Sequence, residues 1–199
     1  MSERAPRPVQ IDVGQIVRRS VATLYSHLVT RPTGRAVRLA IESQLNEAVG
    51  GAGAGDTTFS LIDMSEVTIL DFSCADEVVA KLLLRTLGQD RPWDAFFVFR
   101  GVGDLHRASM EAVLERQGLA AVAQSETGVF ELLGDLSREE EEAWIRVEEW
   151  GRVPHGRVDT LFPRTDHRSA LDRLVGRRLV YQGGSQDIHA LSRLVGDLV

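Results

Sequence analysis

The first two thirds of the chain alternate between two hydrophobic periods. Short apolar runs predict strands, and apolar residues spaced by three or four positions predict helices. The expected elements, in order, are strands at Val9–Val13 and Val21–Leu28, a helix at Ala36–Ala48, a strand at Thr58–Asp63, a helix whose apolar stripe runs from Ala75 to Leu83, a strand at Ala95–Phe99, a helix at Leu105–Gln117, a strand at Leu119–Ala123 and a helix at Thr127–Leu136. Because parallel strands need such crossovers, this pattern favours an α/β fold, a sheet with helices packed on it.

Three local features sharpen this interpretation. The run Ala95–Phe99 is apolar throughout, which is typical of a central strand that is covered on both faces. Ser73 is followed three residues later by Asp76, which resembles a capping box, so Ser73 is expected to cap the helix. Gly118 is expected to close the preceding helix at its C′ position.

The remainder of the chain is mostly helical in pattern. Ser137 and Glu140 form a capping-box pattern, which predicts a helix that Pro154 and Gly156 break. The later expected elements are a short apolar turn at Val158–Phe162, a helix at His167–Gly176, two short strands within Leu179–Leu191 joined at Gly183–Gly184, and a helix at Leu191–Val199.

Composition places the chain among ordinary folded proteins. Of its 199 residues, 43 % are hydrophobic and 26 % are charged, which is usual for a globular protein. Cys74 is the single cysteine, so the chain cannot form an internal disulfide and a reducing compartment is favoured. No apolar run approaches the roughly 18 residues that a membrane helix needs, and Met1–Pro8 lacks the apolar core of a signal peptide. We therefore expect a cytoplasmic protein with no membrane contact.

Charge is distributed unevenly around a net value of −6. Residues 1–151 carry 15 Lys/Arg and 24 Asp/Glu (−9), whereas residues 152–199 carry 8 Lys/Arg and 5 Asp/Glu (+3). A basic tail is compatible with nucleic-acid binding. A charge of +3 over this length is also ordinary for a protein surface, so both interpretations stay open.

The segments SLIDMSEVTILDFSCADEVVAKLLL and AFFVFRGVGDLHRASMEAVLERQGL carry a family resemblance. Together with the elements around them, roughly residues 9–136, they resemble a STAS domain, the family that includes the bacterial anti-sigma factor antagonists. Asp63 and Asp71 match the two acidic positions of that family, and Gly118-Leu119 matches its closing pair. The resemblance implies a STAS-like mixed sheet with helices packed on it.

The same resemblance implies a regulatory activity that is not catalytic. Such domains bind a partner, often a histidine-kinase-like ATPase that acts as an anti-sigma factor and switches binding off by phosphorylating a serine at the helix start. Phe72 stands at the family's acceptor position and Cys74 stands where the family often has glycine, so Ser73 is the candidate phospho-acceptor here. The candidate partner-binding residues are Asp71, Phe72, Ser73, Asp76 and Glu77.

The tail segment HRSALDRLVGRRLVYQGGSQDIHAL resembles the end of a winged-helix domain. The resemblance implies that a helix at His167–Val175 would enter the major groove of DNA and that a hairpin at Tyr181–His189 would touch the DNA backbone. The candidate phosphate contacts are Arg164, Arg168, Arg173, Arg177 and Arg178. Asp166 and Asp172 in the same region oppose phosphate binding, and winged helices also serve as protein–protein modules.

Patterns that would indicate catalysis are missing from the sequence. Gly101 and Gly103 lack the third glycine of a dinucleotide-binding fingerprint, because His106 occupies that position. The five histidines have no metal-ligand spacing with cysteine or with one another, and no Gly-x-Ser-x-Gly elbow occurs. Cys74 is interpreted as a small buried residue in the corner between strand and helix. We therefore expect no enzyme activity, no metal site and no cofactor.

These features lead to one main hypothesis and two alternatives. The main hypothesis is a bacterial regulatory protein with a disordered lead-in at 1–8, a STAS-like domain at 9–136 that docks a protein through residues 72–77, and a small winged-helix-like domain at 137–199 that adds a second contact or dimerises. The first alternative is a transcription regulator whose tail binds nucleic acid through residues 152–199 and whose STAS-like domain senses a signal. The second alternative is a small-ligand site near Asp63 and Asp71.

Overall fold

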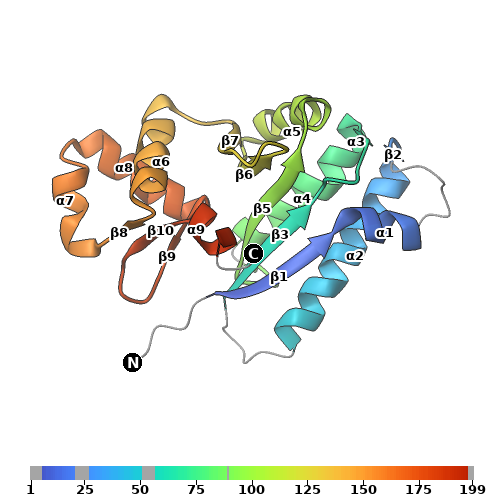
Figure 1. Cartoon of the computed structure of the whole chain (residues 1–199), viewed down its shortest axis with the longest axis horizontal. Helices are drawn as coiled ribbons and strands as arrows, with labels where there is room; N and C mark the ends of the chain where they lie inside the picture. Colours follow the sequence, from blue (N-terminus) through green and yellow to red (C-terminus); the bar gives the residue numbers. More distant parts are fainter. Residues whose placement is uncertain (1–5, 21–26, 51–56, 89, 197–199) are drawn as a thin grey trace. The chain divides into compact units, whose positions relative to one another are not determined.

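The computed structural model describes residues 6–20, 27–50, 57–88 and 90–196, which form two compact units (Figure 1). The N-terminal unit comprises Arg7–Asp135, and Leu136–Val199 make up most of the second unit. The N-terminal unit has an α/β fold with a mixed sheet, as the sequence predicts. No helix within the described ranges is long and apolar enough to cross a membrane.

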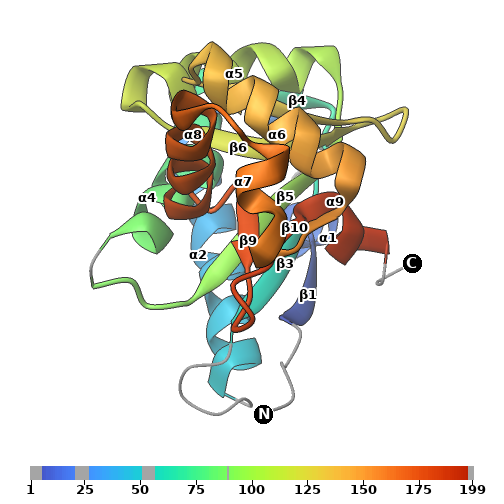
Figure 2. The same cartoon turned by 90° about the vertical axis from the view of Figure 1, so that its left-hand side faces the viewer.

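The N-terminal unit alternates strands and helices along the sequence. Its elements are β1 (Arg7–Asp12), α1 (Val13–Ser20), β2 (His27–Leu28), α2 (Arg31–Gly50), β3 (Thr58–Asp63), β4 (Ile69–Leu70), α3 (Phe72–Ala75), the π-helical turn η1 (Asp76–Ala80), α4 (Lys81–Leu87), β5 (Ala95–Val102), α5 (Asp104–Gln117), β6 (Ala120–Ser125) and β7 (Phe130–Gly134). The main sheet has the strand order β1-β3-β5-β6-β7, in which β7 runs antiparallel to β6 and the other neighbours are parallel. Strands β1, β3 and β5 lie side by side in both views (Figures 1 and 2). The middle strand, β5, is buried from Ala95 to Phe99, as its unbroken apolar sequence predicts.

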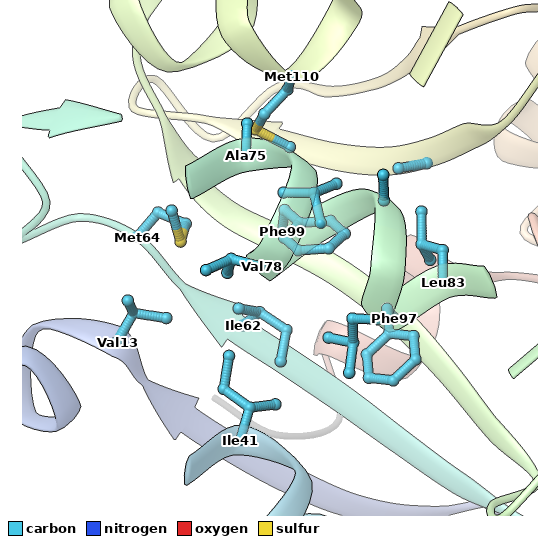
Figure 3. Packing of buried hydrophobic residues seen from close by; sticks show 14 of the residues in the cluster. Val13, Ile41, Ile62, Met64, Ala75, Val78, Leu83, Phe97, Phe99 and Met110 are labelled. Atoms are coloured by element: carbon cyan, nitrogen blue, oxygen red, sulfur yellow. The ribbon is translucent and has the colours of Figure 1, made fainter. Parts of the chain in front are cut away.

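The main hydrophobic core lies between this sheet and the helices. Alternate strand residues point to the same face, so Ile62 of β3 and Phe99 of β5 both face the helices. Ile41 of α2 and Met110 of α5 complete the cluster from the helical side (Figure 3). The apolar stripe predicted at 75–83 is buried in the same cluster. Burying each large apolar side chain contributes roughly 1.5–3 kcal/mol, so this stripe fixes the chain segment that precedes it.

The helix predicted at Thr127–Leu136 is wrong, because this segment contains the edge strand β7. A tight turn precedes the strand, closed by a hydrogen bond from Ser125 N to Val129 O (2.9 Å), and Gly128 in this turn has a φ of +87°. Strand β7 then pairs with β6, and Leu133 enters the core. Strand pairing and the turn glycine override the helix-like spacing of the apolar residues.

The start of the unit also differs from the prediction. Strand β1 begins at Arg7, within the predicted lead-in, and continues directly into α1, a helix that the apolar pattern does not predict. Of the strand predicted at Val21–Leu28, residues 21–26 lie outside the described part of the chain, and His27–Leu28 form β2. Helix α2 begins at Arg31, earlier than predicted, since proline is tolerated in the first turn of a helix.

The second unit is mostly helical. Its elements are α6 (Arg138–Trp150), β8 (Arg152–Val153), the 3-10 turn η2 (His155–Arg157), α7 (Val158–Leu161), α8 (Thr165–Gly176), β9 (Val180–Gln182), β10 (Ile188–Ala190) and α9 (Leu191–Gly196). The three strands form an antiparallel sheet in the order β8-β10-β9. The predicted capping box is confirmed, because Ser137 Oγ accepts the Glu140 N–H (3.2 Å) and Glu140 Oε2 accepts the Ser137 N–H (2.9 Å).

Two details of this unit differ from the prediction. The segment predicted as an apolar turn is a turn of helix, α7, which is followed by the fully buried Phe162. Strands β9 and β10 are joined by residues 183–187, a longer loop than the predicted turn of two glycines, and Gly183 N–H donates to Asp187 O (3.1 Å) across it. Helix α9 covers the start of the final predicted helix, and residues 197–199 lie outside the described part of the chain.

Candidate protein-docking site

The predicted docking residues lie at the corner where β4 leads into α3. Asp71 is extended (φ −79°, ψ 165°), and its Oδ1 accepts the Cys74 N–H (2.8 Å) and the Ser73 hydroxyl (2.9 Å). Partial burial disfavours the charged carboxylate, but these hydrogen bonds hold the pKa of Asp71 below its usual value. The prediction that Ser73 caps the helix is therefore wrong. The capping residue is Asp71, and Ser73 supports it with a hydrogen bond.

Phe72 and Cys74 differ sharply in exposure. The Phe72 side chain is 38 % exposed, and the guanidinium carbon of Arg116 lies 5.8 Å from the centre of its ring. Cys74 is fully buried, and its Sγ–H donates to Thr30 O (3.0 Å). Burial raises the pKa of the Cys74 thiol to about 11, so the thiol stays protonated and unreactive near neutral pH. A Cβ added to Gly34 would lie 2.9 Å from Cys74 Cα, which shows how closely α2 packs against the corner.

Asp76 and Glu77 form ion pairs beneath the surface. Asp76, whose side chain is 14 % exposed, pairs with Arg31 (2.6 Å) and Lys81 (3.5 Å). Glu77, which is 3 % exposed, pairs with Arg31 (3.2 Å) and Arg38 (3.3 Å). It also pairs with Lys81, one helical turn further on. Burial opposes ionisation of both carboxyls, but the surrounding cations hold the pKa of each below its usual value.

The same ion pairs continue along α2 and α4. Glu42 of α2 accepts hydrogen bonds from Arg38 (2.5 Å) and from Arg85 of α4 (2.8 Å). The guanidinium group of Arg85 also lies 5.3 Å from the centre of the Trp93 ring. These contacts tie α2 to α4. The prediction did not include the cations, although the (i, i+4) spacing of Arg38 and Glu42 is the pattern that indicates them.

The predicted docking residues therefore fall into two groups. Phe72 is exposed, and Asp71 and Ser73 are partly exposed, so all three are accessible from solvent. Asp76 is mostly covered and Glu77 is almost fully covered by their cationic partners. The accessible part of the corner is its first three residues, whereas the two acidic residues that follow hold the helices together.

Asp63, the other acidic position of the STAS resemblance, lies at the end of β3. Its carboxylate lies 3.7 Å from Arg100 Nε and accepts the Ser65 N–H (3.0 Å). No hydrogen bond or ion pair among the described residues joins Asp63 to Asp71. The small-ligand hypothesis requires Asp63 and Asp71 to lie at the mouth of one site. The contacts of the two residues do not support that arrangement.

At least four of the candidate phosphate contacts of the tail lie in ion pairs. The pairs are Arg164–Asp166, Arg168–Asp159 (3.3 Å), Arg173–Glu140 (3.5 Å) and Arg177–Glu140 (3.1 Å). The fifth residue, Arg178, lies just after α8 with a φ of +60°. The ion pairs reduce the positive charge that the tail would present to a phosphate backbone.

Neither a metal site in the described part of the chain nor a similarity to known proteins indicates a function. Among the residues that the structure describes, no group of three or more His, Cys, Asp or Glu side chains is arranged to hold a metal ion. No protein family, curated protein or solved structure matches the chain. The features that bear on function are therefore the geometry of the corner and the element order of the second unit.

Proposed function

We propose that the chain is a non-catalytic regulatory protein of the cytoplasm that binds another protein through the accessible part of the corner, Asp71–Ser73. This is the function that its resemblance to anti-sigma factor antagonists implies. The observation that carries the proposal is the exposure of Phe72 on a fixed backbone, anchored by the Asp71 cap and by the burial of Cys74. Aromatic side chains held in this way contribute strongly to interfaces, since little conformational freedom remains to be lost on binding.

Further exposed apolar side chains lie around Phe72 and support the proposal. They are Val29 (47 % exposed) and Ile69 (38 %). Asp71 N–H donates to Leu28 O (2.8 Å), which sets the residue after Leu28 beside the corner. The corner therefore offers an apolar surface with Phe72 in it, as interface cores require.

In the proposed function, Ser73 is the site of regulation. Its hydroxyl donates to the Asp71 carboxylate (2.9 Å). A phosphate on Ser73 would add about −1.5 to −2 charges beside that carboxylate. Repulsion between the two groups would weaken the Asp71 cap and release the partner. A kinase-like anti-sigma factor would then be both the partner and the enzyme that switches binding off.

The substitution Phe72→Ala tests the proposed function. The tagged protein is used to capture its partner from nuclease-treated lysate of its own cells, and the affinity of the purified partner is then measured. We expect Phe72→Ala to weaken binding about tenfold or more, as loss of an aromatic anchor does, with an unchanged circular dichroism spectrum. Val129→Ala removes an apolar side chain that is 61 % exposed in the turn between β6 and β7, and should bind normally. Equal affinity of the two variants would exclude the corner as the docking site.

A second candidate function is DNA binding by the second unit. The order of one helix, a strand, two helices and a two-stranded hairpin is similar to that of winged-helix domains, and this similarity supports the proposal. Helix α8 would then enter the major groove. The test is the affinity for duplex DNA as a function of salt, with Arg168→Gln and Arg173→Gln expected to flatten the dependence. Duplex binding that neither salt nor these substitutions change would reject this function.

A further inference from the structure

The members of the ion pairs among α2, η1 and α4 are exposed unequally. Three of their cations are substantially exposed, Arg31 (51 %), Lys81 (40 %) and Arg85 (46 %), whereas the fourth, Arg38 (12 %), is covered. Their carboxylates are covered: Asp76 (14 %), Glu77 (3 %) and Glu42 (8 %). Solvent, or a partner, therefore meets Arg31, Lys81 and Arg85 more than the carboxylates that they pair with.

Helical spacing enlarges this cationic surface. Arg35 lies one turn from both Arg31 and Arg38, so the three arginines share one face of α2. Lys81 and Arg85 share one face of α4. We name the four exposed cations the cationic band: Arg31, Arg35, Lys81 and Arg85. Counted with the covered Arg38 and the three carboxylates beneath it, the band carries a net +2, whereas residues 7–135 as a whole carry 12 Lys/Arg and 17 Asp/Glu (−5).

Exposed leucines lie among these cations. Leu39 is 49 % exposed and lies one turn after Arg35, and Leu84 is 44 % exposed and lies one turn after Lys81. Apolar and cationic side chains on neighbouring helices suit an amphipathic segment whose polar face is acidic. Duplex nucleic acid fits less well, because it is bound through many phosphate contacts and offers no apolar face at its backbone.

We infer that the cationic band binds an acidic, amphipathic segment of the partner protein, whose apolar residues contact Leu39 and Leu84. The inference rests on the proposed docking function and specifies the chemistry of the partner. Arg35 is the residue that tests it most cleanly. Its side chain is exposed and forms no ion pair with any residue that the structure describes, so its substitution breaks no ion pair among those residues.

The first experiment locates the partner on the surface. The full chain carries the photo-cross-linker benzoylphenylalanine at Leu84, at Phe72 or, as a control, at Val129, and is irradiated in its own cells. We expect the first two positions to cross-link the same protein and the third to give none. Mass spectrometry of the product from Leu84 should identify a segment with an excess of Asp and Glu.

The second experiment measures the contribution of charge. The segment cross-linked from Leu84 is made as a synthetic peptide, and its affinity is measured for Arg35→Lys, Arg35→Gln and Arg35→Glu. We expect Arg35→Lys to bind like the wild type, Arg35→Gln to bind more weakly, and Arg35→Glu to lose about tenfold. The differences should shrink as salt rises from about 0.05 to about 0.5 M, since salt screens exposed charges.

The outcomes separate this inference from the function on which it rests. A neutral or basic segment at Leu84, a nucleic acid there, no product there, or equal affinity across the Arg35 series would each overturn the cationic band. Cross-linking from Phe72 would leave the proposed function standing in all four cases. The absence of a protein product from Phe72 would overturn the proposed function, and the inference with it.

Discussion

Replacing Glu77 with glutamine should destabilise the N-terminal unit. Glu77 is 3 % exposed, and its loss of charge leaves Arg38, which is 12 % exposed, with Glu42 as its remaining partner. Removing one member of a buried ion pair costs about 3–5 kcal/mol. Because Arg38 keeps Glu42, and because Arg31 and Lys81 are partly solvated, the loss should fall below that range, at about 2–3 kcal/mol.

Native-state hydrogen exchange is the appropriate assay, because a chain with two units need not unfold in a single step. The amides of α2 and β3 should exchange about 30- to 150-fold faster in Glu77→Gln, which is the factor that 2–3 kcal/mol represents. The control is Glu47→Gln on α2, where the side chain is exposed and a change of about 0.5 kcal/mol or less is expected. Equal exchange rates in the two variants would refute the structural role of Glu77.

Three further predictions follow from the same contacts. The folded-state pKa values of Asp71, Asp76 and Glu77 lie below their unfolded-state values. The stability that these carboxylates contribute is therefore full above the unfolded-state pKa values and is lost as pH falls through the folded-state values. Unfolding by urea should become easier between about pH 5 and pH 3, and an unchanged urea midpoint would contradict this. Cys74 should react with a thiol reagent only at the rate at which the corner opens, so labelling that is as fast in the native chain as in urea would show the thiol to be accessible. Ser137→Ala should lower the stability of the second unit by about 1 kcal/mol through loss of the cap, measured by hydrogen exchange in α6.

Elements with strong local patterns were predictable from the sequence. The strand Thr58–Asp63 and the apolar stripe at 75–83 occur where their hydrophobic periods place them. Gly118 ends α5 with a φ of +63°, and Ser137 caps α6. In each case the interactions that determine the element lie within a few residues along the chain, so the local sequence is sufficient to predict it.

Features that depend on distant residues were not predictable in the same way. Strand β7 was expected to be a helix, because its pairing with β6 is a tertiary contact that local spacing does not show. The burial of Glu77 depends on Arg31 and Arg38, which lie 46 and 39 residues earlier in the chain. From the sequence, Glu77 is an acidic residue in the first turn of a helix, which is usually exposed. Because these ion pairs bury Glu77, it is a structural residue and not part of the docking surface.

The most direct test of the docking function is a hydrogen-exchange footprint of the whole chain with and without its purified partner. Exchange should slow at residues 69–75, around Phe72, when the partner is bound. The same measurement with duplex DNA should leave these amides unchanged. Protection by the partner that is confined to residues 164–190, with none around Phe72, would contradict docking through Phe72 and assign binding to the second unit.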